Sequence, residues 1–207
     1  MLERFRHFWT NVLAPPADFL LRIGVKPDWV TIVGTVGVSA GALWFFPRGQ
    51  FFVGVMVITL FVFSDLIDGD MARKSGQSSK WGAFLDSTLD RVADSAIFGG
   101  LVLFYASSAH HDTLYLSLSL LCLVLGWITS YARARAEGLG MTAKGGIAER
   151  ADRLVAILVM TGLSGLFDLP ILREIALWAL AVASAVTVVQ RMAIVHKQAV
   201  VHPSEGS

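Results

Sequence analysis

Six long apolar segments, separated by short polar connections, are the feature of this sequence that most limits its possible folds. They cover roughly residues 29–46, 51–72, 83–106, 114–132, 154–167 and 171–192. A helix that spans a bilayer needs about 20 mostly apolar residues, and most of these segments approach or exceed that length. With 55% hydrophobic and 16% charged residues, the chain is too apolar for an ordinary soluble domain. We therefore predict an all-α integral membrane protein with six transmembrane helices in one domain over residues 27–197.

The two ends of the chain lie outside this domain. Within residues 1–26, apolar residues recur at helical intervals between polar ones, at Phe5, Phe8, Trp9, Val12 and Leu13. This spacing gives a helix one apolar face and is typical of an amphipathic helix in the membrane interface. We therefore expect an interfacial helix within residues 1–26 and a C-terminal tail at residues 198–207.

The positions of the basic residues indicate how the helices are oriented. With six spans, both termini and the second and fourth connections lie on the same side of the membrane. That side carries 14 of the 17 Lys and Arg residues. The other face has Arg48 and Arg173, and Arg91 lies inside the third segment. Because basic residues favour the cytoplasmic side of a membrane, we expect a multi-pass protein of the cell membrane with both termini cytoplasmic.

The second and third segments carry acidic side chains that a lipid-facing helix would avoid. Asp65 and Asp68 stand three residues apart, and Asp86 and Asp90 stand four apart, so each pair shares one face of its helix. Ionisable side chains at membrane depth cost several kcal/mol and usually face polar cavities. We therefore predict that these four carboxylates meet in one cleft.

Four carboxylates in one cleft repel one another unless cations lie between them. Their hard oxygen atoms suit Mg²⁺ or Mn²⁺, and two such ions about 3.5 to 4 Å apart form the usual clamp for phosphoryl chemistry. The eight residues from Asp65 to Arg73 correspond to about 12 Å of helix. The predicted site therefore lies just inside the cytoplasmic leaflet, where the phosphate of a phospholipid could reach it.

The acidic residues belong to a longer pattern. They fall in the stretch DLIDGDMARKSGQSSKWGAFLDSTLD, which has the form DxxDGxxARx8Gx3Dx3D. These eight fixed positions resemble the signature of the CDP-alcohol phosphotransferase family, and the six-segment layout extends the resemblance over the whole chain. Asp70 and Asp94 lie outside the signature. We interpret Asp70 as a residue in the wall of the cleft and Asp94 as the ion-pair partner of Arg91, rather than as metal ligands.

The resemblance implies a six-helix homodimer whose active site opens to the cytoplasm. In the family, the metal ions are held at positions that match Asp65, Asp68, Asp86 and Asp90. The last of these, Asp90, is also assigned as the base that deprotonates the acceptor hydroxyl. The pocket for the CDP-lipid is shaped at positions that match Gly69, Ala72, Arg73 and Gly82.

The start of the first span adds a further resemblance. Pro27, Asp28 and Thr31 resemble the family's Pro-Asn-x-x-Thr sequence, with aspartate in place of asparagine. This resemblance assigns Thr31 to the CDP-lipid pocket. Asp28 either lines the same pocket or simply caps the helix.

Three arginines bear on the acceptor alcohol. Arg135, Arg153 and Arg191 fall near the cytoplasmic ends of the last three segments. Each alone could anchor its helix at the headgroups, but together they favour an acceptor that already carries a phosphate, because guanidinium binds phosphate bidentately. The stretch SYARARAEGLGMTAKGGIAERADRL and the later VVQR resemble actinobacterial phosphatidylinositol phosphate synthases, in which the matching arginines bind the phosphate of inositol 1-phosphate.

The resemblance thus implies a reaction between CDP-diacylglycerol and inositol 1-phosphate, catalysed by a protein that is surrounded by membrane lipids. We expect Asp90 to take the proton of the inositol hydroxyl, whose oxygen attacks the β-phosphorus while CMP leaves. Charge on the leaving phosphate would be held by the metal and Arg73. Phosphatidylinositol phosphate would be the product.

Several alternatives remain open. A phosphatidylglycerophosphate synthase would also present arginines to a phosphate, that of glycerol 3-phosphate. Synthases that use serine or free inositol would leave the three arginines without a role beyond topology. A divalent-cation or proton transporter would gather aspartates in a membrane cleft, but it would need a path to the far face. The intact signature argues against a non-catalytic scaffold, and no feature predicts a nucleic acid partner.

Overall fold

The computed structural model describes residue 15 and residues 18–74, 79–107 and 109–201. For residues 63–66, 68–70, 72, 73 and 201 it describes the backbone but not the side chains. The amphipathic helix predicted within residues 1–26 lies largely outside the described residues, although residues 18–22 are helical. Of the tail predicted at residues 198–207, residues 198–201 belong to the last helix, which ends at Val201, and the rest lies outside the described residues.

The described part of the chain contains helices and no strand. Its six long helices are α2 (Pro27–Phe45), α3 (Phe51–Lys74), α4 (Lys80–Ala106), α5 (Thr113–Gly138), α6 (Arg150–Leu166) and α7 (Pro170–Val201). A short 3-10 helix, η1 (Phe46–Arg48), follows α2. The helices coincide in order with the six predicted segments, so the all-α prediction is confirmed. Both α5 and α7 continue beyond their apolar stretches into polar residues, which hydropathy alone could not delimit.

Polar side chains set where several helices begin. Ser79 Oγ accepts a hydrogen bond from the Gly82 amide at 2.9 Å at the start of α4. Asp112 accepts bonds from two amides of the first turn of α5. At the start of α6, Glu149 and Asp152 form a reciprocal capping box. These acceptors satisfy amides that the first turn of a helix leaves unpaired, so the helix starts are encoded locally.

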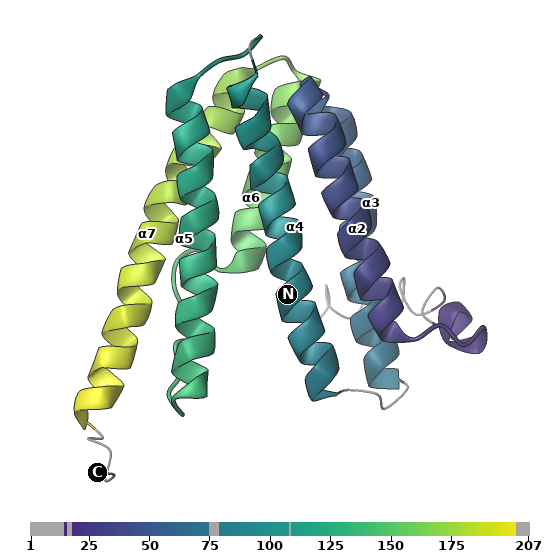
Figure 1. Cartoon of the computed structure of the whole chain (residues 1–207), viewed down its shortest axis with the longest axis vertical. Coiled ribbons are helices and arrows are strands. Elements are labelled where there is room, and N and C mark those ends of the chain that lie inside the picture. Colours follow the sequence, from purple (N-terminus) through teal and green to yellow (C-terminus); the bar gives the residue numbers. More distant parts are fainter. Residues whose placement is uncertain (1–14, 16–17, 75–78, 108, 202–207) are drawn as a thin grey trace, which may run out of the picture.

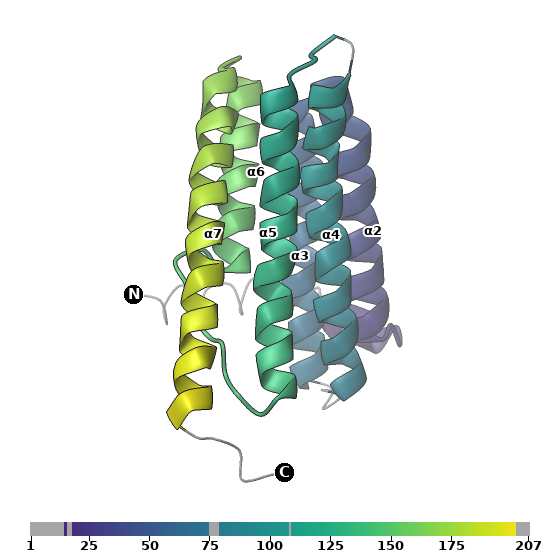
Figure 2. The same cartoon turned by 60° about the vertical axis from the view of Figure 1, so that its left-hand side comes forward.

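The six helices stand side by side and close into a ring (Figures 1 and 2). Around the ring the order is α2, α3, α6, α7, α5 and α4, with α4 in contact with α2 again. The turns that follow α2, α4 and α6 lie at one end, and α3, α5 and α7 finish at the other. We call this second end, where α3 finishes at Lys74 and α4 begins at Lys80, the basic end.

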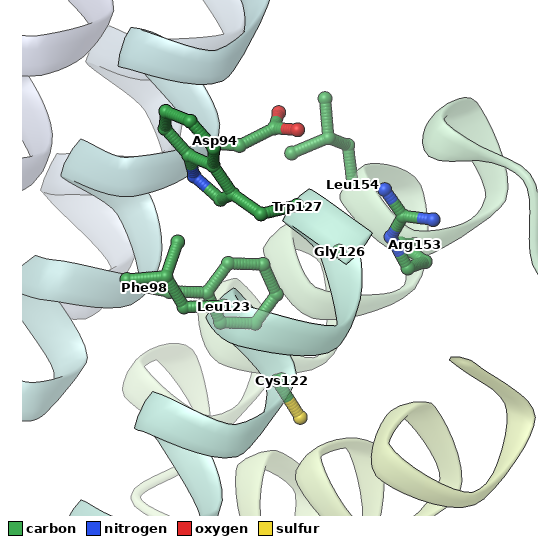
Figure 3. Close-up of a pocket in the computed structure, with 8 residues that line it drawn as sticks. All are labelled: Asp94, Phe98, Cys122, Leu123, Gly126, Trp127, Arg153 and Leu154. Carbon is green, nitrogen blue, oxygen red and sulfur yellow. The ribbon is translucent and has the colours of Figure 1, made fainter. Parts of the chain in front are cut away.

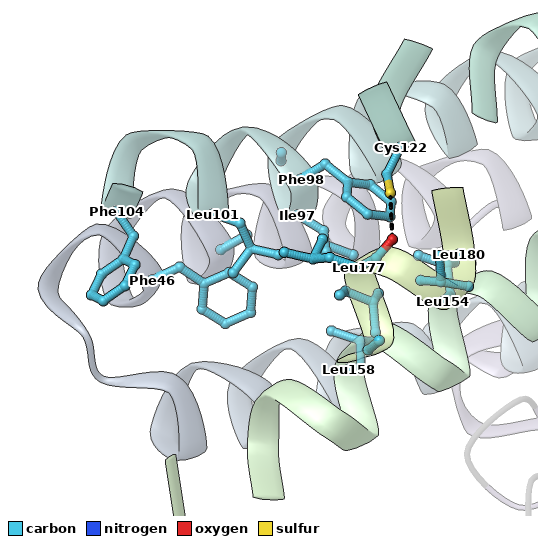
Figure 4. Packing of buried hydrophobic residues seen from close by; sticks show 14 of the residues in the cluster. Phe46, Ile97, Phe98, Leu101, Phe104, Cys122, Leu154, Leu158, Leu177 and Leu180 are labelled. Carbon is cyan, nitrogen blue, oxygen red and sulfur yellow. Dashed lines mark hydrogen bonds between the residues drawn. The ribbon is translucent and has the colours of Figure 1, made fainter. Parts of the chain in front are cut away.

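The apolar core fills the half of the bundle away from the basic end. Its large members include Phe46, Phe51, Ile97, Phe98, Leu101, Phe104, Tyr105 and Leu177, several of which are drawn in Figure 4. Residues 80–92 of α4 include no buried residue, whereas α4 supplies the core from Ala93 onward. Cys122 is buried there as a small apolar residue, and its thiol donates to the Leu177 carbonyl at 3.4 Å. Packing in this half leaves the α4 residues near the basic end available for a site.

The helix α6 begins part-way along the bundle. Residues 139–149 run from the end of α5 beside α7 to the start of α6 (Figure 2). With 17 residues against 32 in α7, α6 does not reach the basic end. Its first turn, which begins at Arg150, therefore lies beside the middle of its neighbours rather than at their ends.

The composition of the helices fits a membrane protein. Among the described residues, Pro27–Arg48, Thr113–Gly138 and Pro170–Val200 are long and apolar enough to cross a membrane, and Phe51–Val62 is a shorter apolar stretch. Large apolar side chains such as Leu60, Val182 and Val189 are exposed on the bundle, where lipid would cover them. Charged residues in α4 lower its mean hydropathy, so the count of six spans stays a prediction.

Candidate active site

The acidic face of α4 lies on the part of the helix that does not contribute to the core. Asp86 and Asp90 stand four residues apart in one continuous helix, so they share a face as predicted. Asp86 is exposed, whereas Asp90 is partly buried. Arg150 Nη2 lies 2.8 Å from Asp90 Oδ1. The Asp90 side chain therefore extends from α4 to the first turn of α6, where it pairs with Arg150.

One turn further along α4, Asp94 joins the same charges. Its carboxylate lies 3.2 Å from Arg150 Nε and 3.4 Å from Arg91 Nη2, which confirms the predicted pairing with Arg91. Arg91 Nη2 also lies 3.7 Å from Asp90 Oδ2. We call Asp90, Arg91, Asp94 and Arg150 the charge cluster; its two carboxylates and two guanidinium groups compensate one another at the edge of the buried core.

The α3 part of the signature is placed by its backbone alone. Asp65, Asp68, Gly69, Ala72 and Arg73 all lie within the continuous helix α3, but their side chains are outside the described part of the structure. The helical backbone puts Asp65 and Asp68, three residues apart, on one face. The signature therefore lies on two helices that both adjoin α2.

The donor chemistry of the four aspartates fits a hard divalent cation, because Mg²⁺ and Mn²⁺ prefer carboxylate oxygens. Among the described side chains, no group of three or more His, Cys, Asp or Glu residues could hold a metal ion. Asp86 and Asp90 by themselves are too few ligands, so a cation at this face needs carboxylates from α3 as well. Asp65 and Asp68 are the residues that the sequence offers for that purpose.

Two residues predicted for the CDP-lipid pocket lie near the basic end of α2 and α4. A Cβ atom placed on Gly82 would lie 3.8 Å from Asp28 Oδ1, so α2 passes close to this glycine. Thr31 is buried, and its hydroxyl donates to the Pro27 carbonyl at 3.2 Å. The N-cap of α2 is Lys26, so the alternative that Asp28 caps this helix is wrong. Asp28 lies in the first turn and is directed toward Gly82.

Two of the three predicted acceptor arginines are buried inside the bundle. Arg153 is 3% exposed and donates from Nη1 to the Ala148 carbonyl at 3.2 Å. Arg191 is 5% exposed and donates from Nη1 to the Thr129 carbonyl at 2.7 Å and from Nε to the Gly145 carbonyl at 3.1 Å. Carbonyl groups orient a guanidinium group without neutralising it, so the positive charge of both arginines remains available to an anion.

Arg135 lies apart from this pair. It occupies the last turn of α5 and is exposed. Its Cα lies six residues beyond Thr129, the residue whose carbonyl binds Arg191, which corresponds to about 9 Å of helix. The structure thus places Arg153 and Arg191 in the interior and leaves Arg135 at the basic end.

A small pocket lies between α4, α5 and α6, next to the charge cluster (Figure 3). Its lining is formed by Asp94, Phe98, Cys122, Leu123, Gly126, Trp127, Arg153 and Leu154. Asp94 and Arg153 supply the charged groups, and most of the other lining side chains are apolar. Arg153 lies close to α5 here: a Cβ atom on Gly126 would be 3.5 Å from Arg153 Nη2, which is an ordinary van der Waals contact.

The connection between α5 and α6 is bound to α7 by polar side chains, of which the sequence analysis singled out Arg191 alone. Polar residues recur at helical intervals along α7 and bind backbone groups of residues 142–148: Thr187, Gln190, Arg191 and Gln198. Thr187 Oγ1, for example, accepts from the Ala148 amide at 3.1 Å. Polar residues at this spacing within an apolar helix are a signal that could have predicted the contact.

Comparison with known proteins decides the family. The family model described as CDP-alcohol phosphatidyltransferase matches residues 25–189, a range that contains the whole acidic signature and Arg153. The chain belongs to the CDP-alcohol phosphatidyltransferase family. The resemblance inferred from the eight signature positions is therefore confirmed, and the protein is a phosphatidyl-transferring enzyme.

Curated members of the family resemble the chain over nearly its full length. A phosphatidylinositol phosphate synthase of Streptomyces avermitilis is 55% identical over 93% of this chain and 81% of its own. The synthase of Cutibacterium acnes is 49% identical over 93% of this chain and 96% of its own. The predicted likeness to actinobacterial synthases is thus confirmed.

Solved structures of a family member have the same fold. The phosphatidylinositol phosphate synthase of Mycobacterium tuberculosis, in complex with manganese and citrate, matches with a TM-score of 0.84 and 42% identity over 89% of this chain and 88% of its own. The same enzyme with CDP-DAG bound also gives a TM-score of 0.84, at 41% identity over 89% of this chain and 94% of its own.

A first prediction concerns Gly146 in the connection to α6, which lies between Gly145 and Ala148, the residues whose carbonyls bind Arg191 and Arg153. Its φ is +129°, and a Cβ atom there would overlap Thr187 Cγ2. Thr187 cannot rotate away without losing its bonds to Ala148 and to the Ala183 carbonyl. We expect Gly146→Ala to displace the start of α6 and lower phosphatidyl transfer at least about tenfold, since misplacement by about 1 Å can cost up to about a hundredfold.

Gly140 provides the matched control. It also has a positive φ, +74°, but nothing lies within 4 Å of an added Cβ atom. Gly140→Ala should therefore bear the cost of the left-handed backbone alone, about 1 to 2 kcal/mol, and keep near-normal turnover. Rates of CMP release measured side by side test the pair, and equal losses in both variants would contradict the role of the Thr187 contact.

Proposed function

We propose that this protein transfers the phosphatidyl group of CDP-diacylglycerol to the hydroxyl of inositol 1-phosphate and releases CMP. The observation that carries the proposal is the burial of Arg153 and Arg191, each held by backbone carbonyls in the bundle that also presents Asp90. Burying a guanidinium group costs free energy unless the group is paired with an anion. An acceptor that already bears a phosphate would supply that anion.

Asp90 is the proposed base. It accepts the proton of the acceptor hydroxyl, and the oxygen then attacks the β-phosphorus of the CDP-lipid. The bond between the β-phosphorus and the CMP oxygen breaks, and the electron pair leaves with CMP. Arg73 is proposed to bind the phosphate oxygens of the nucleotide, because its fork of donors matches that geometry.

Metal ions have a supporting role in the proposal. Mg²⁺ or Mn²⁺, bound as two ions by Asp65, Asp68, Asp86 and Asp90, would neutralise charge on the pyrophosphate. The manganese complex of the mycobacterial relative supports this choice of cation. The carboxylates that would hold these ions come from α3 and α4, the two helices on either side of α2 in the ring.

The CDP-lipid is proposed to bind between α2, α3 and α4. Gly69 and Gly82 allow a phosphate or base to approach the backbone, and Ala72 leaves space beside them. Thr31 lies on α2 three residues after Asp28, and Asp28 Oδ1 would lie 3.8 Å from a Cβ atom placed on Gly82. The relative with CDP-DAG bound supports a donor of this chemical class.

The distribution of apolar segments and basic residues supports a proposal for how the protein lies in the membrane. We propose a multi-pass protein of the cell membrane with six spans over residues 27–197, an interfacial helix within residues 1–26, and a basic end that faces the cytoplasm. Lys74 and Lys80 mark this end, and basic residues favour the cytoplasmic side. A homodimer remains part of the proposal through the family resemblance.

A second candidate shares the donor and differs in the acceptor. Glycerol 3-phosphate also carries a phosphate that Arg153 and Arg191 could bind, which would make the protein a phosphatidylglycerophosphate synthase. The two phosphorylated acceptors differ in the number and placement of their hydroxyl groups, and the arginines by themselves do not choose between them.

The decisive experiment compares acceptors with the purified protein. We expect manganese-dependent CMP release from CDP-diacylglycerol with inositol 1-phosphate, at least about tenfold faster than with glycerol 3-phosphate or free inositol. Faster release with glycerol 3-phosphate would establish the second candidate. Absence of CMP release, together with divalent-cation uptake into vesicles containing the protein, would favour a transporter instead.

An arginine variant tests how the acceptor is bound. Arg153→Met should raise the KM for inositol 1-phosphate about ten- to a hundredfold, because a hydrogen-bonded charged contact contributes about 1.5 to 3 kcal/mol, and change the KM for CDP-diacylglycerol little. Arg133→Met is the control, since Arg133 is exposed and paired with Glu137 on the same helix turn. An unchanged KM in Arg153→Met would contradict the assignment.

A further inference from the structure

Arg150 is the first residue of α6, a position that does not favour an arginine. The N-terminus of a helix carries partial positive charge, so a cation in the first turn is unfavourable. The capping box of Glu149 and Asp152 already satisfies this helix start. Arg150 is therefore not needed to begin the helix, and its contacts across the bundle are the feature that remains to be explained.

Those contacts join α6 to the acidic face of α4. Arg150 Nη2 lies 2.8 Å from Asp90 Oδ1, and Arg150 Nε donates to Asp94 Oδ1 at 3.2 Å. The side chains are progressively less exposed, at 28% for Arg150, 19% for Asp90 and 8% for Asp94. One guanidinium group thus bridges two carboxylates that lie one turn apart, in a setting more shielded from water than a surface ion pair.

Through Arg150, the proposed base Asp90 is connected to the helix turn that carries Arg153, the proposed ligand of the acceptor phosphate. Arg153 lies three residues after Arg150, in the first turn of the same short helix, and is fixed by the Ala148 carbonyl. The Ala148 amide is in turn bound by Thr187 of α7. The first turn of α6 therefore carries Arg153 and, three residues before it on the same face, Arg150, which contacts Asp90.

We propose that Arg150, with Asp94, is a positioning pair that sets where the Asp90 carboxylate lies relative to Arg153. The inference rests on the proposed function, because it takes Asp90 as the base and Arg153 as a ligand of the acceptor phosphate. In this role Arg150 binds neither substrate. It fixes the distance between the group that removes the proton and the group that holds the phosphate, and such distances strongly affect rate.

The proposal predicts that replacing Arg150 lowers kcat but increases the affinity for the metal ion. Arg150→Gln keeps a polar but shorter side chain and removes one positive charge near the carboxylates. Less positive charge beside Asp90 strengthens the attraction of a cation, so Mn²⁺ should bind more tightly. The lost bridge leaves Asp90 less well placed, so kcat should fall about ten- to a hundredfold while the KM for the acceptor stays within about threefold.

The test uses the full-length protein and five variants: Arg150→Gln, Arg150→Lys, Asp94→Asn, the double variant Arg150→Gln with Asp94→Asn, and Arg133→Gln. Because both single changes break one bridge, the double variant should lose little more kcat than the worse single variant. Arg150→Lys, which can reach one carboxylate, should recover part of the rate. Arg133→Gln makes the same charge change at an exposed residue of α5 and should behave as wild type.

The measurements are kcat and KM from CMP release, and Mn²⁺ binding by electron paramagnetic resonance without any substrate. A raised acceptor KM with normal kcat would make Arg150 a substrate ligand and overturn the proposal. Additive losses in the double variant, weaker Mn²⁺ binding in Arg150→Gln, or an equal loss in Arg133→Gln would also overturn it. If the wild type prefers glycerol 3-phosphate, the proposed acceptor is wrong, but the same comparison with that acceptor still decides the role of Arg150.

Discussion

Replacing Asp90 with asparagine should lower kcat by about a thousandfold or more while leaving the CDP-lipid bound. Asparagine has nearly the same shape as aspartate, and its side-chain oxygen can still accept a bond from Arg150, which lies 2.8 Å from the carboxylate. It cannot take up a proton at neutral pH. General-base catalysis contributes about a hundred- to ten-thousandfold, and the lost charge also weakens the attraction of the metal ions.

Two measurements check this result, CMP release and equilibrium binding of CDP-diacylglycerol. The control is Asp168→Asn, the same chemical change at the opposite end of the bundle. Asp168 is exposed and has a φ of 53°, a conformation that asparagine adopts readily. A near-normal rate for Asp90→Asn would remove Asp90 from the role of base.

Adding one methyl group at Gly100 should destabilise the whole bundle. A Cβ atom there would lie 2.7 Å from the Ala42 carbonyl oxygen and 3.2 Å from Phe46 Cβ. The oxygen belongs to the backbone of α2, so no side chain can rotate to make room. Close helix packing through small residues is a main source of stability in membranes, and overpacking costs about 1 to 3 kcal/mol. We expect Gly100→Ala to lower the Tm by about 5 °C.

The neighbouring residue supplies the control. Nothing lies within 4 Å of a Cβ atom placed on Gly99, and alanine favours a helix by about 1 kcal/mol over glycine. Gly99→Ala should therefore keep or raise the Tm, as measured by thermal unfolding in detergent. A fall in Tm as large as that of Gly100→Ala would show that helix propensity or solubilisation, rather than the contact with α2, governs the response.

The helices could be predicted because their signals are local. Each apolar segment carries its own length and composition, and caps such as Ser79 and Asp112 lie within a few residues of the amides they bind. The ends of α5 and α7 were placed too early. Polar residues at those ends continue the helix, and hydropathy does not distinguish a helical polar turn from a loop.

Pairs along one helix were predictable, and pairs between helices were not. Asp94 and Arg91 stand three residues apart, so the helical repeat predicts their contact. Asp94 and Arg150 are separated by 56 residues, and no periodicity relates them. The same holds for Thr187 and Ala148, which are separated by 39 residues.

The sequence by itself determined the helical class, the acidic signature and the family, since each depends on residue types at short fixed spacing within a helix or across one turn. Only the tertiary structure decided that α6 begins inside the bundle, that Arg150 reaches Asp90 and Asp94, and that Arg153 and Arg191 are buried while Arg135 is exposed. Those features depend on how distant helices pack, and packing is set by side-chain shape across the whole ring rather than by any single stretch of chain.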